Sequence, residues 1–516
     1  MGTRTNHQGM QVEIEAPGIE YPITRTPARF MDLIGNHKVA QFENIYDADF
    51  EYGEQSLRWE RLLLGGATVV HLPQAGGVRL SVGTAAGDVA IRQSRPYHRY
   101  QPGKTMAMAS NILMDPAVVN NRQRLGFFDD SNGCFFEQAD PDNANNNPSG
   151  MGVVIRSDIS GLVVDNRVPM HQWNGNRDFI NSIRWDRQQM VYIEYTWYGG
   201  GSVKFGVMLD GQPYILHQEN YSNRSGQTTP WCRTGNLPVR YETRNIAAAA
   251  LASTLIHYGV SVGIWGGSNP QRGFTYTYGM ALGQPTRTVP ANTSRFPLLS
   301  IRMRPMGTQE YTQANAALTG GTTTSATIGT TPWSADQWRG RHFNYFVGGV
   351  SYMARITANT NNTLTLVDPI RGGPLAVAPV AGQPYTIGLV NRGQLLPKRL
   401  WITSTALAQA EIFFSTGTSP IVLSGSNFVA MNTLGSPGSF AERDVAATSF
   451  TGGERVKKFP LPAGGSGIEP VDLSDLFALY NNIRGTLPDI MTLAITTQAA
   501  TPTNAGGDFD AQEAMS

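Results

Sequence analysis

A block of short alternating segments between Arg95 and Asn245 constrains the fold of this chain more than any other part. Runs such as LGFFDD, GCFFEQ, GVVIRS and VYIEYTWYG are short, largely apolar at alternate positions, and interrupted by Gly, Asn, Asp and Pro. Period-two alternation bounded by turn formers is typical of β-strands that turn one face to a core. The block therefore predicts stacked β-sheets, and it contains no catalytic signature.

The composition supports a globular β-rich chain and excludes several classes of protein. Of the 516 residues, 56 are Gly, 31 are Pro and 41% are hydrophobic, which combines many turn formers with enough apolar side chains for sizeable cores. Charged residues make up 15% and the net charge is +1, so no attraction to nucleic acid or anionic lipid is expected. The chain has no run of about 18 apolar residues and no apolar signal-peptide segment at its start. We therefore expect a protein that is made in a cytoplasm, stays soluble there and does not insert into a membrane.

Turn-rich and proline-rich stretches divide the chain into four expected regions. Residues 1–70 are predicted to form an N-terminal arm or entry region, for which an arm ordered by a neighbouring subunit and a flexible tail stay equal alternatives. Residues 71–316 are predicted to form the main β-sandwich domain, of jelly-roll or concanavalin-like type. Residues 317–390 indicate an inserted small β domain, and residues 391–516 indicate a further C-terminal β-sandwich region. The predicted fold class is mostly β throughout.

Short segments give more local expectations. The pairs Asn132-Gly133 and Asp210-Gly211 lie between strand-like runs, which predicts a hairpin turn at each. The run NIAAAALASTLIHYG, residues 245–259, has helical spacing with Ala and Leu enrichment, but a buried strand fits it as well. The run DLSDLFALYNNI, residues 472–483, favours a short helix.

No pattern of metal or cofactor ligands emerges. The eight His residues are scattered without HxH or HExxH spacing. Cys134 and Cys232 belong to no CxxC pair and are predicted to be free thiols, with a disulfide left open. The loop from Asp140 to Asn147 is rich in oxygen atoms that suit calcium, but it lacks the spacing of a calcium loop and favours a solvated turn. We expect no metal and no cofactor.

Catalytic signatures are absent as well. The chain has no GxSxG, no P-loop, and no GxGxxG between a strand and a helix. A glycoside hydrolase needs two carboxylates that face each other across a sugar, and sequence spacing brings no such pair together. The carboxylates considered for that role are Asp129, Asp130, Glu137 and Glu194. We predict no catalytic residues and a protein that is not an enzyme.

The aromatic run over residues 192–198 favours packing inside the sandwich. One face of this strand carries Ile193, Tyr195 and Trp197, which fits a core. The alternate face is more polar and leaves a second interpretation, contact with a glycan or a partner protein. The residues predicted for that contact are Tyr192, Glu194 and Tyr198.

A local basic patch is formed by Arg92, Arg95, His98, Arg99 and Lys104. Nucleic-acid binding normally requires a wider stripe of basic residues than this one. The patch therefore favours a salt-bridged surface that faces another subunit.

The order of several segments resembles a known family. The segments are YHRYQPGK, RLGFFD followed by NGCFF, GVVIRS, VYIEYTWYGGGSVKFGVMLDG, HQENYSN and LPVRYETRN, and later LLSIRMRP, VNRGQLLPKRLWI and DVAATSFTGGERV. In this order they are similar to a family of bacteriophage virion structural proteins found as tail-associated or appendage components. The resemblance implies a building block of a particle, and it implies no catalytic residues.

The stretch between these segments resembles a second family. Trp333, the run from Gln337 to Gly340, and the segments ARITANTNNTLTLVDP and PYTIG are similar to a small β module that recurs in phage tail, neck and fibre proteins. The glycine-rich turn of that module is shortened here to VGGVSY. Together the two resemblances cover roughly residues 90–460.

The sequence therefore predicts a structural subunit of a bacteriophage particle, with the tail (sheath, ring or fibre attachment) as the favoured position. The predicted location is the virion, assembled in the host cytoplasm. Its expected partners are copies of itself and other virion proteins, because one repeated chain usually forms symmetric homo-oligomers. Two alternatives stay open: a receptor-binding protein for host surface glycan, and a depolymerase.

Overall fold

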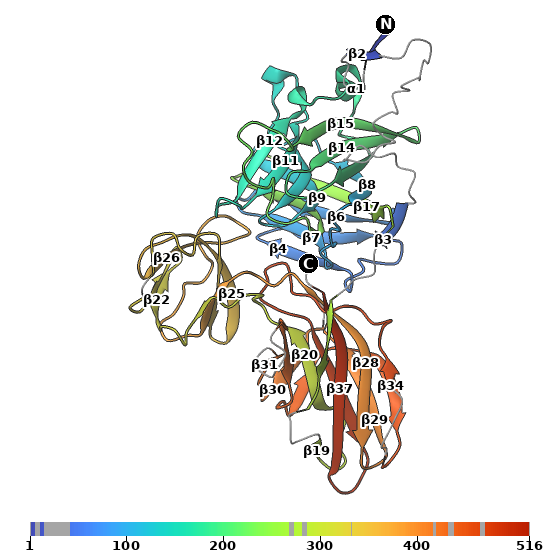
Figure 1. Ribbon diagram of the computed structural model, residues 1–516, viewed down its shortest axis with the longest axis vertical. Coiled ribbons are helices and arrows are strands. Elements are labelled where there is room, and N and C mark those ends of the chain that lie inside the picture. The colour runs from blue at the N-terminus through green and yellow to red at the C-terminus, as the bar shows by residue number, and fades with distance from the viewer. Residues whose placement is uncertain are drawn as a thin grey trace.

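The computed structural model describes residues 2–5, 11–14, 42–267, 273–280, 286–331, 333–415, 419–431, 438–464 and 470–514. Figure 1 shows three β-rich bodies in this part of the chain: a large one, a small one at its side, and an elongated one at the opposite end. The described residues include one α-helix, α1 (Arg177–Ser182), and no helix that is long and apolar enough to cross a membrane. The predicted mostly β fold built on sandwiches is confirmed.

The large body is a sandwich of two antiparallel sheets. Sheet 1 has the strand order β12-β11-β10-β9-β16-β7-β4. In that order its strands span Val164–Pro169, Met151–Ser157, Gly133–Gln138, Asn121–Phe128, Val239–Asn245, Val89–Ser94 and Trp59–Leu64. Sheet 2 has the order β15-β14-β13-β8-β17-β6-β5, and β3 also pairs with β17. Its strands span Gln212–Asn220, Ser202–Leu209, Gln189–Tyr195, Thr105–Met114, Ser253–Trp265, Gly77–Val82 and Thr68–Leu72, with β3 at Phe42–Ala48.

Alternation along each strand explains why the two sheets pack. On β9, Leu125 and Phe127 are fully buried in the core between the sheets, whereas Arg124 lies on the outer face of sheet 1. On β13, Ile193 and Tyr195 enter the same core, as the sequence predicts. Each side chain of this size contributes about 1.5–3 kcal/mol when it is fully buried. Because the apolar side chains point into the core, the alternate positions on the outer faces of the sheets can hold polar and charged residues.

The small body is one antiparallel sheet, sheet 3, with the order β21-β27-β24-β25-β26-β23-β22. In that order its strands span Tyr311–Thr312, Tyr385–Gly388, His342–Val347, Val350–Asn359, Thr363–Val367, Ser325–Ile328 and Leu318–Thr322. Trp333 and Trp338 pack edge to face in its core, with ring centroids 5.8 Å apart. Arg355 on β25 reaches the large sandwich, where it lies 2.9 Å from Asp158 and donates to Ser131 at 2.7 Å. This buried contact joins the small body to the large one.

The elongated body is a second sandwich, with strands from both sides of the small body. Sheet 4 has the order β18-β37-β28-β35, with β19 on β37, and sheet 5 has the order β31-β32-β20-β36-β29-β34. Sheet 4 comprises Phe274–Tyr278, Thr503–Ala514, Gln394–Ser404, Val471–Asp472 and Arg287–Val289; sheet 5 comprises Val429–Ala430, Ala441–Asp444, Phe296–Met303, Ile490–Thr497, Ala408–Phe414 and Glu454–Leu461. Two short strand pairs stand apart: β1 (Gly2–Thr5) with β2 (Gln11–Ile14), and β30 (Val422–Ser424) with β33 (Ser449–Thr451).

The arrangement differs from the expected regions in three places. Strand β21, which the sequence boundaries put in the main domain, pairs with β27 in sheet 3 of the small body. Strands β18, β19 and β20, which the sequence boundaries put in the main domain, lie in the sheets of the elongated sandwich. Strands β3 and β4, expected in the N-terminal region, pair with sheets 2 and 1. The extended arm predicted before them falls mostly on residues 15–41, which lie outside the described residues.

Three local predictions have a clear outcome. Strands β14 and β15 are joined by Asp210 and Gly211, with φ of 50° and 71°, so the predicted two-residue turn is confirmed. The other predicted hairpin joins β9 to β10, but its turn is Asp129–Asn132, and Gly133 already belongs to β10. Cys134 and Cys232 are both buried free thiols.

Two ambiguous runs also have an outcome. The Ala-rich run is neither one helix nor one strand: residues 246–252 form a largely exposed loop, and only residues 253–259 fit the buried-strand alternative, as the start of β17. The helix predicted for residues 472–483 is wrong. That segment has only the end of β35 and turns, because Leu473 and Leu479 are each buried in the core of the elongated sandwich and Leu479 bridges to Leu395 on β28.

Candidate functional site

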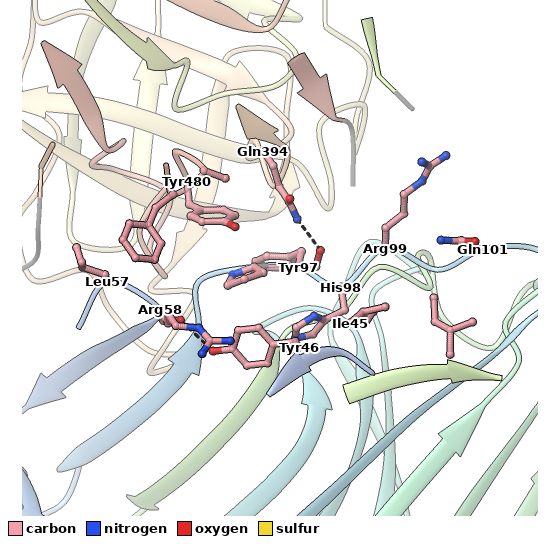
Figure 2. A pocket seen from close by; sticks show the side chains of 14 residues that line it. Ile45, Tyr46, Leu57, Arg58, Tyr97, His98, Arg99, Gln101, Gln394 and Tyr480 are labelled. Atoms are coloured by element: carbon pink, nitrogen blue, oxygen red, sulfur yellow. Dashed lines mark hydrogen bonds between the residues drawn. The ribbon is translucent and has the colours of Figure 1, made fainter. Parts of the chain in front are cut away.

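An open cleft lies where the large sandwich meets the elongated sandwich (Figure 2). Its cavity measures about 380 Å³. The interdomain cleft is lined by Ile45, Tyr46, Leu57, Arg58, Pro96–Arg99, Gln101 and Ile264 from the large sandwich, and by Gln394, Phe477, Ala478 and Tyr480 from the elongated one. Because both sandwiches contribute walls, the site exists only when the two are docked.

Aromatic rings form much of the lining. In Figure 2, Tyr480 faces Tyr46 and Tyr97 from the opposite wall. Phe477 is 41% exposed, although it is a large apolar side chain. Burial raises the pKa values of Tyr46 and Tyr480 above the usual range, so both phenols stay protonated. The Tyr46 hydroxyl donates to the backbone carbonyl of Arg58 at 3.3 Å. The cleft therefore combines apolar ring surfaces with the phenol group of Tyr480.

Two arginines line the cleft without an acidic partner. The guanidinium of Arg58 lies over the ring of Tyr46, with Cζ 4.6 Å from the centroid. Neither Arg58 nor Arg99 places its guanidinium in a hydrogen bond or ion pair with another described residue, and both are partly buried. No Asp or Glu is among the lining residues. His98 adds no charge near neutral pH, because burial lowers its pKa to about 3.

Polar contacts hold the two walls together. Arg95 on the large sandwich donates to both carboxylate oxygens of Asp489 at 2.7 Å. Glu60 on β4 accepts a hydrogen bond from the backbone N–H of Ile483 at 2.9 Å. Gln394 on β28 donates its side-chain amide to the backbone carbonyl of Tyr97 at 3.0 Å, as Figure 2 shows. These contacts fix the width of the cleft.

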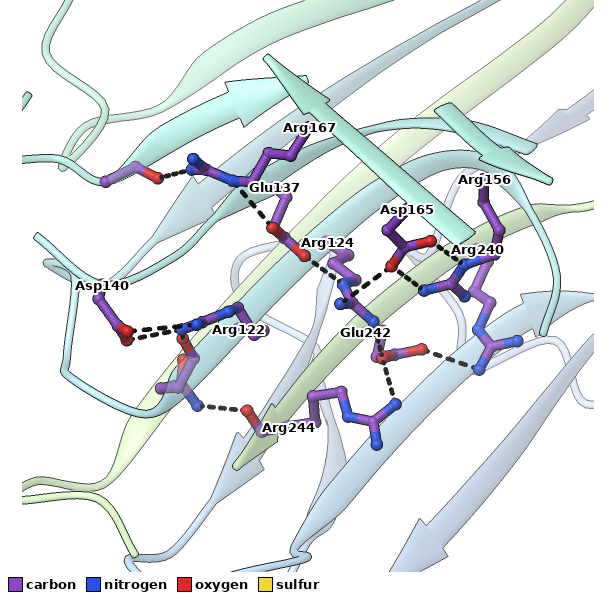
Figure 3. A network of polar contacts seen from close by, with 12 residues as sticks. Arg122, Arg124, Glu137, Asp140, Arg156, Asp165, Arg167, Arg240, Glu242 and Arg244 are labelled. Atoms are coloured by element: carbon purple, nitrogen blue, oxygen red, sulfur yellow. Dashed lines mark hydrogen bonds and ion pairs between the residues drawn. The ribbon is translucent and has the colours of Figure 1, made fainter. Parts of the chain in front are cut away.

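The outer face of sheet 1 carries a different kind of polar site, the arginine network (Figure 3). Arg124 lies between Glu137 and Glu242, which flank it on the neighbouring strands, at 2.7 and 3.1 Å. The other ion pairs of the network join Arg167 to Glu137, Arg156 to Asp165, Arg240 to Asp130 and Glu242, Arg244 to Glu242, and Arg122 to Asp140. Opposite charges on adjacent strands stabilise a sheet, so this face is internally neutralised.

The arginines determine how the carboxylates of this network titrate. Burial disfavours the charge on Glu242, but Arg240 and Arg124 outweigh it and hold the pKa of this carboxyl well below its usual range. Arg156 and Arg124 likewise outweigh burial at Asp165 and lower its pKa. A general acid has to keep its proton near neutral pH. Neither carboxyl group meets that requirement.

Each of the four carboxylates considered for hydrolysis has structural partners within the fold. Asp129 accepts hydrogen bonds from the backbone N–H groups of Ser131 and Asn132 and so caps a turn. Asp130 and Glu137 belong to the arginine network, as described above. Glu194 lies on sheet 2, directly opposite Lys204. In the Asp140–Asn147 loop, Asp142 accepts from the N–H of Asn145, and no cluster of metal-binding side chains occurs among the described residues.

The predicted contact residues Tyr192, Glu194 and Tyr198 do not form one surface. Tyr192 and Glu194 are 8% and 6% exposed. The ring of Tyr192 covers its cross-strand neighbour Gly206, where an added Cβ would lie 2.3 Å from the ring. Tyr198 is exposed, but it follows the end of β13 and packs against Tyr100. The prediction that Tyr192 and Glu194 offer a contact face is therefore corrected.

The predicted basic patch is divided by the fold. Arg92 and Arg95 are buried and paired, with Glu54 at 3.9 Å and Asp489 at 2.7 Å. Lys104 donates to the carbonyl of Gly267 at 2.7 Å. His98 and Arg99 instead line the interdomain cleft. The remaining cleft residues carry no sequence motif, so the cleft was not predicted.

Comparisons with known proteins complete the description. No family model matches the chain, and no curated protein matches it. Solved structures that are similar include a glycosyl hydrolase family 16 protein from Mycobacterium smegmatis (10% identity, 43% of this chain and 100% of that chain, TM-score 0.28). They also include the exoplasmic/lumenal domain of VIP36 in a Ca²⁺/Man3GlcNAc-bound form (8%, 43% and 89%, TM-score 0.26) and lectin I-B4 from Griffonia simplicifolia (8%, 42% and 99%, TM-score 0.26). At this identity the likeness concerns the fold alone.

One prediction about activity is corrected by these matches. The chain was predicted not to be an enzyme, yet glycosyl hydrolases stand among the similar structures. We therefore withdraw that prediction, and hydrolysis is measured alongside binding in the experiments below.

Proposed function

We propose that the protein binds carbohydrate in the interdomain cleft. The observation that carries this proposal is the lining: Tyr480 and the exposed Phe477 stand beside amide and guanidinium groups in one cavity of about 380 Å³. The C–H faces of a sugar ring stack on aromatic rings, and its hydroxyl groups bond to amides and guanidinium groups. A concave site with aromatic walls and a few convergent polar groups is the usual form of a ligand site.

The setting of this binding follows from the sequence. In a subunit of a bacteriophage particle, a glycan site would contact polysaccharide on the host surface. The protein would then be both a particle component, as the favoured prediction has it, and a receptor-binding protein, as the alternative has it. The presence of the chain in purified particles tests the setting independently of the cleft.

Substitution of Phe477 tests the site. We expect Phe477→Ala to weaken binding of a host polysaccharide about two- to tenfold, because one lost ring contact of this kind is worth roughly 0.5–1.5 kcal/mol. Since Phe477 is exposed, its substitution should leave the folded state intact. Calorimetric titration of the full chain with oligosaccharides from the host surface measures the affinity, and an assay for reducing ends in the same samples measures hydrolysis.

Tyr198→Leu is the matched control, because Tyr198 is also an exposed aromatic residue but lies outside the cleft lining. Unchanged affinity in Phe477→Ala together with a loss in Tyr198→Leu would place the site at Tyr198 and reject the cleft. Reducing ends that appear with the wild-type chain would make the protein a hydrolase of the bound glycan.

A further inference from the structure

The unpaired arginines of the cleft stand out against the rest of the large sandwich. Among the arginines described between residues 42 and 267, most donate to carboxylates, and Arg177 donates to backbone carbonyls. Arg79 and Arg187 have no partner but are exposed to solvent. Arg58 and Arg99 are the two that are partly buried and without a hydrogen bond or ion pair, and both line the same cavity.

This arrangement is costly unless something complements it. Partial burial removes water from a guanidinium group. The Tyr46 ring offsets part of that loss for Arg58, and the rest is recovered when an acceptor takes the place of the water. Asp489, a carboxylate of the contact between the sandwiches, does not supply the acceptor, because Arg95 donates to both of its oxygens. The lining contains no acidic residue, and its tyrosines and His98 are neutral near pH 7. The cleft is therefore positively charged and short of acceptors.

We infer that the cleft selects a sugar chain that carries carboxylate groups, with Arg58 and Arg99 as the residues that bind them. This inference rests on the proposed function. The planar fork of a guanidinium matches a carboxylate, which it binds with two parallel N–H···O bonds. The aromatic walls receive the ring of the same sugar, so the two kinds of contact select a uronic-acid type of residue over a free anion. Sulfate esters share the charge, and a dextran sulfate oligomer in the experiment separates them from carboxylates.

The test uses matched polysaccharides on the full chain. Oligomers of polygalacturonate, alginate and hyaluronan are each compared with their carboxyl-reduced products, and with a dextran sulfate oligomer, by calorimetric titration. We expect at least one acidic oligomer to bind ten times or more tightly than its reduced product, and dextran sulfate to bind no better than that product. Arg58→Gln and Arg99→Gln should each weaken binding of the acidic oligomer tenfold or more, because each removes charge-assisted hydrogen bonds to a carboxylate, and should weaken binding of the reduced product much less.

Two further variants make the result specific. Arg58→Lys keeps the charge but loses the fork, so it should recover only part of the lost affinity. Arg187→Gln removes an unpaired arginine that lies outside the cleft and should change nothing.

The outcomes separate the inference from the proposed function. Equal binding of acidic and reduced oligomers would overturn the inference and leave carbohydrate binding standing. Stronger binding of dextran sulfate would overturn the choice of carboxylate. Failure of every oligomer, acidic or reduced, would reject both proposals.

Discussion

The arginine network on sheet 1 and the interdomain cleft use the same side chain in opposite ways. In the network, each of the arginines Arg122, Arg124, Arg156, Arg167, Arg240 and Arg244 has a carboxylate within 3.4 Å. In the cleft, Arg58 and Arg99 have none within the part of the chain that the structure describes. An arginine that is paired with a carboxylate of the same chain stabilises the fold. A half-buried arginine without a carboxylate is available to bind a ligand.

The carboxyl groups of the arginine network and those of the contact between the two sandwiches differ in their pKa values. Arginines hold the pKa of Glu242 below its usual range even though the side chain is fully buried. At the contact between the sandwiches, burial raises the pKa of Glu60 to about 7, and neighbouring Arg95 only reduces the shift. Glu60 also has a neighbour of its own sign in Asp489, which adds to the rise. The carboxylates of the network therefore stay ionised at neutral pH, whereas Glu60 at the domain contact is partly protonated.

The strongest way to break the network is to neutralise Glu242. We expect Glu242→Gln to lower the free energy of unfolding by about 3–5 kcal/mol, because Arg124, Arg240 and Arg244 would then share a buried face with too little negative charge. Unfolding of the full chain in denaturant, followed by the fluorescence of its tryptophans, measures the loss. Glu442→Gln is the matched control, since its pair with Arg302 is more accessible to solvent and should contribute at most about 1 kcal/mol. An equal loss of unfolding free energy in the two variants would show that the buried network stabilises the fold no more than an accessible ion pair does.

A smaller effect is expected from pH at the domain contact. The folded chain keeps a proton on Glu60 between pH 4.5 and about 7, where the unfolded chain has released it. The contribution of this group is therefore complete below pH 4.5, and the free energy of unfolding falls as the pH rises through that window. The fall from this one group is on the order of 3 kcal/mol.

Glu60→Gln isolates this contribution, because its amide cannot titrate. The difference in thermal midpoint between wild type and Glu60→Gln should move in favour of the variant as the pH is raised from 5 to 8. The other carboxyl groups are common to both proteins and cancel. A difference that stays constant over this range would show that Glu60 titrates normally and that the contact is insensitive to pH.

The sheets were predictable because their signals are local. Alternation in LGFFDD or VYIEYTWYG depends on neighbours in sequence, and Asp210-Gly211 forms the turn that its φ angles favour. The wrong helix over residues 472–483 shows the limit of such signals. Its leucines satisfy helical spacing, but Leu473 and Leu479 enter a core built by strands that are distant in sequence, and tertiary packing outweighs weak helix propensity.

The cleft could not be predicted for the same reason. Tyr46 and Tyr480 are brought together by the docking of two sandwiches, and no spacing in the sequence records that contact. The basic patch gave a partial signal, since Arg99 belongs both to the patch and to the cleft. Its assignment as salt-bridged holds for Arg92 and Arg95 and fails for Arg99, because only the folded structure reveals which arginines meet a carboxylate.

The smallest effect on stability is expected for the two cleft arginines, which can be compared directly with a network arginine. Arg58→Gln and Arg99→Gln should change the free energy of unfolding by no more than about 0.5 kcal/mol, because neither guanidinium has a carboxylate to lose. Arg240→Gln, which would leave Glu242 and Asp130 with fewer partners, should cost about 3 kcal/mol or more in the same denaturant titration. A large loss in Arg58→Gln would mean that its position over the Tyr46 ring supports the domain contact. The cleft arginine would then serve the fold as the network arginines do, and an affinity change in that variant would no longer identify a ligand contact.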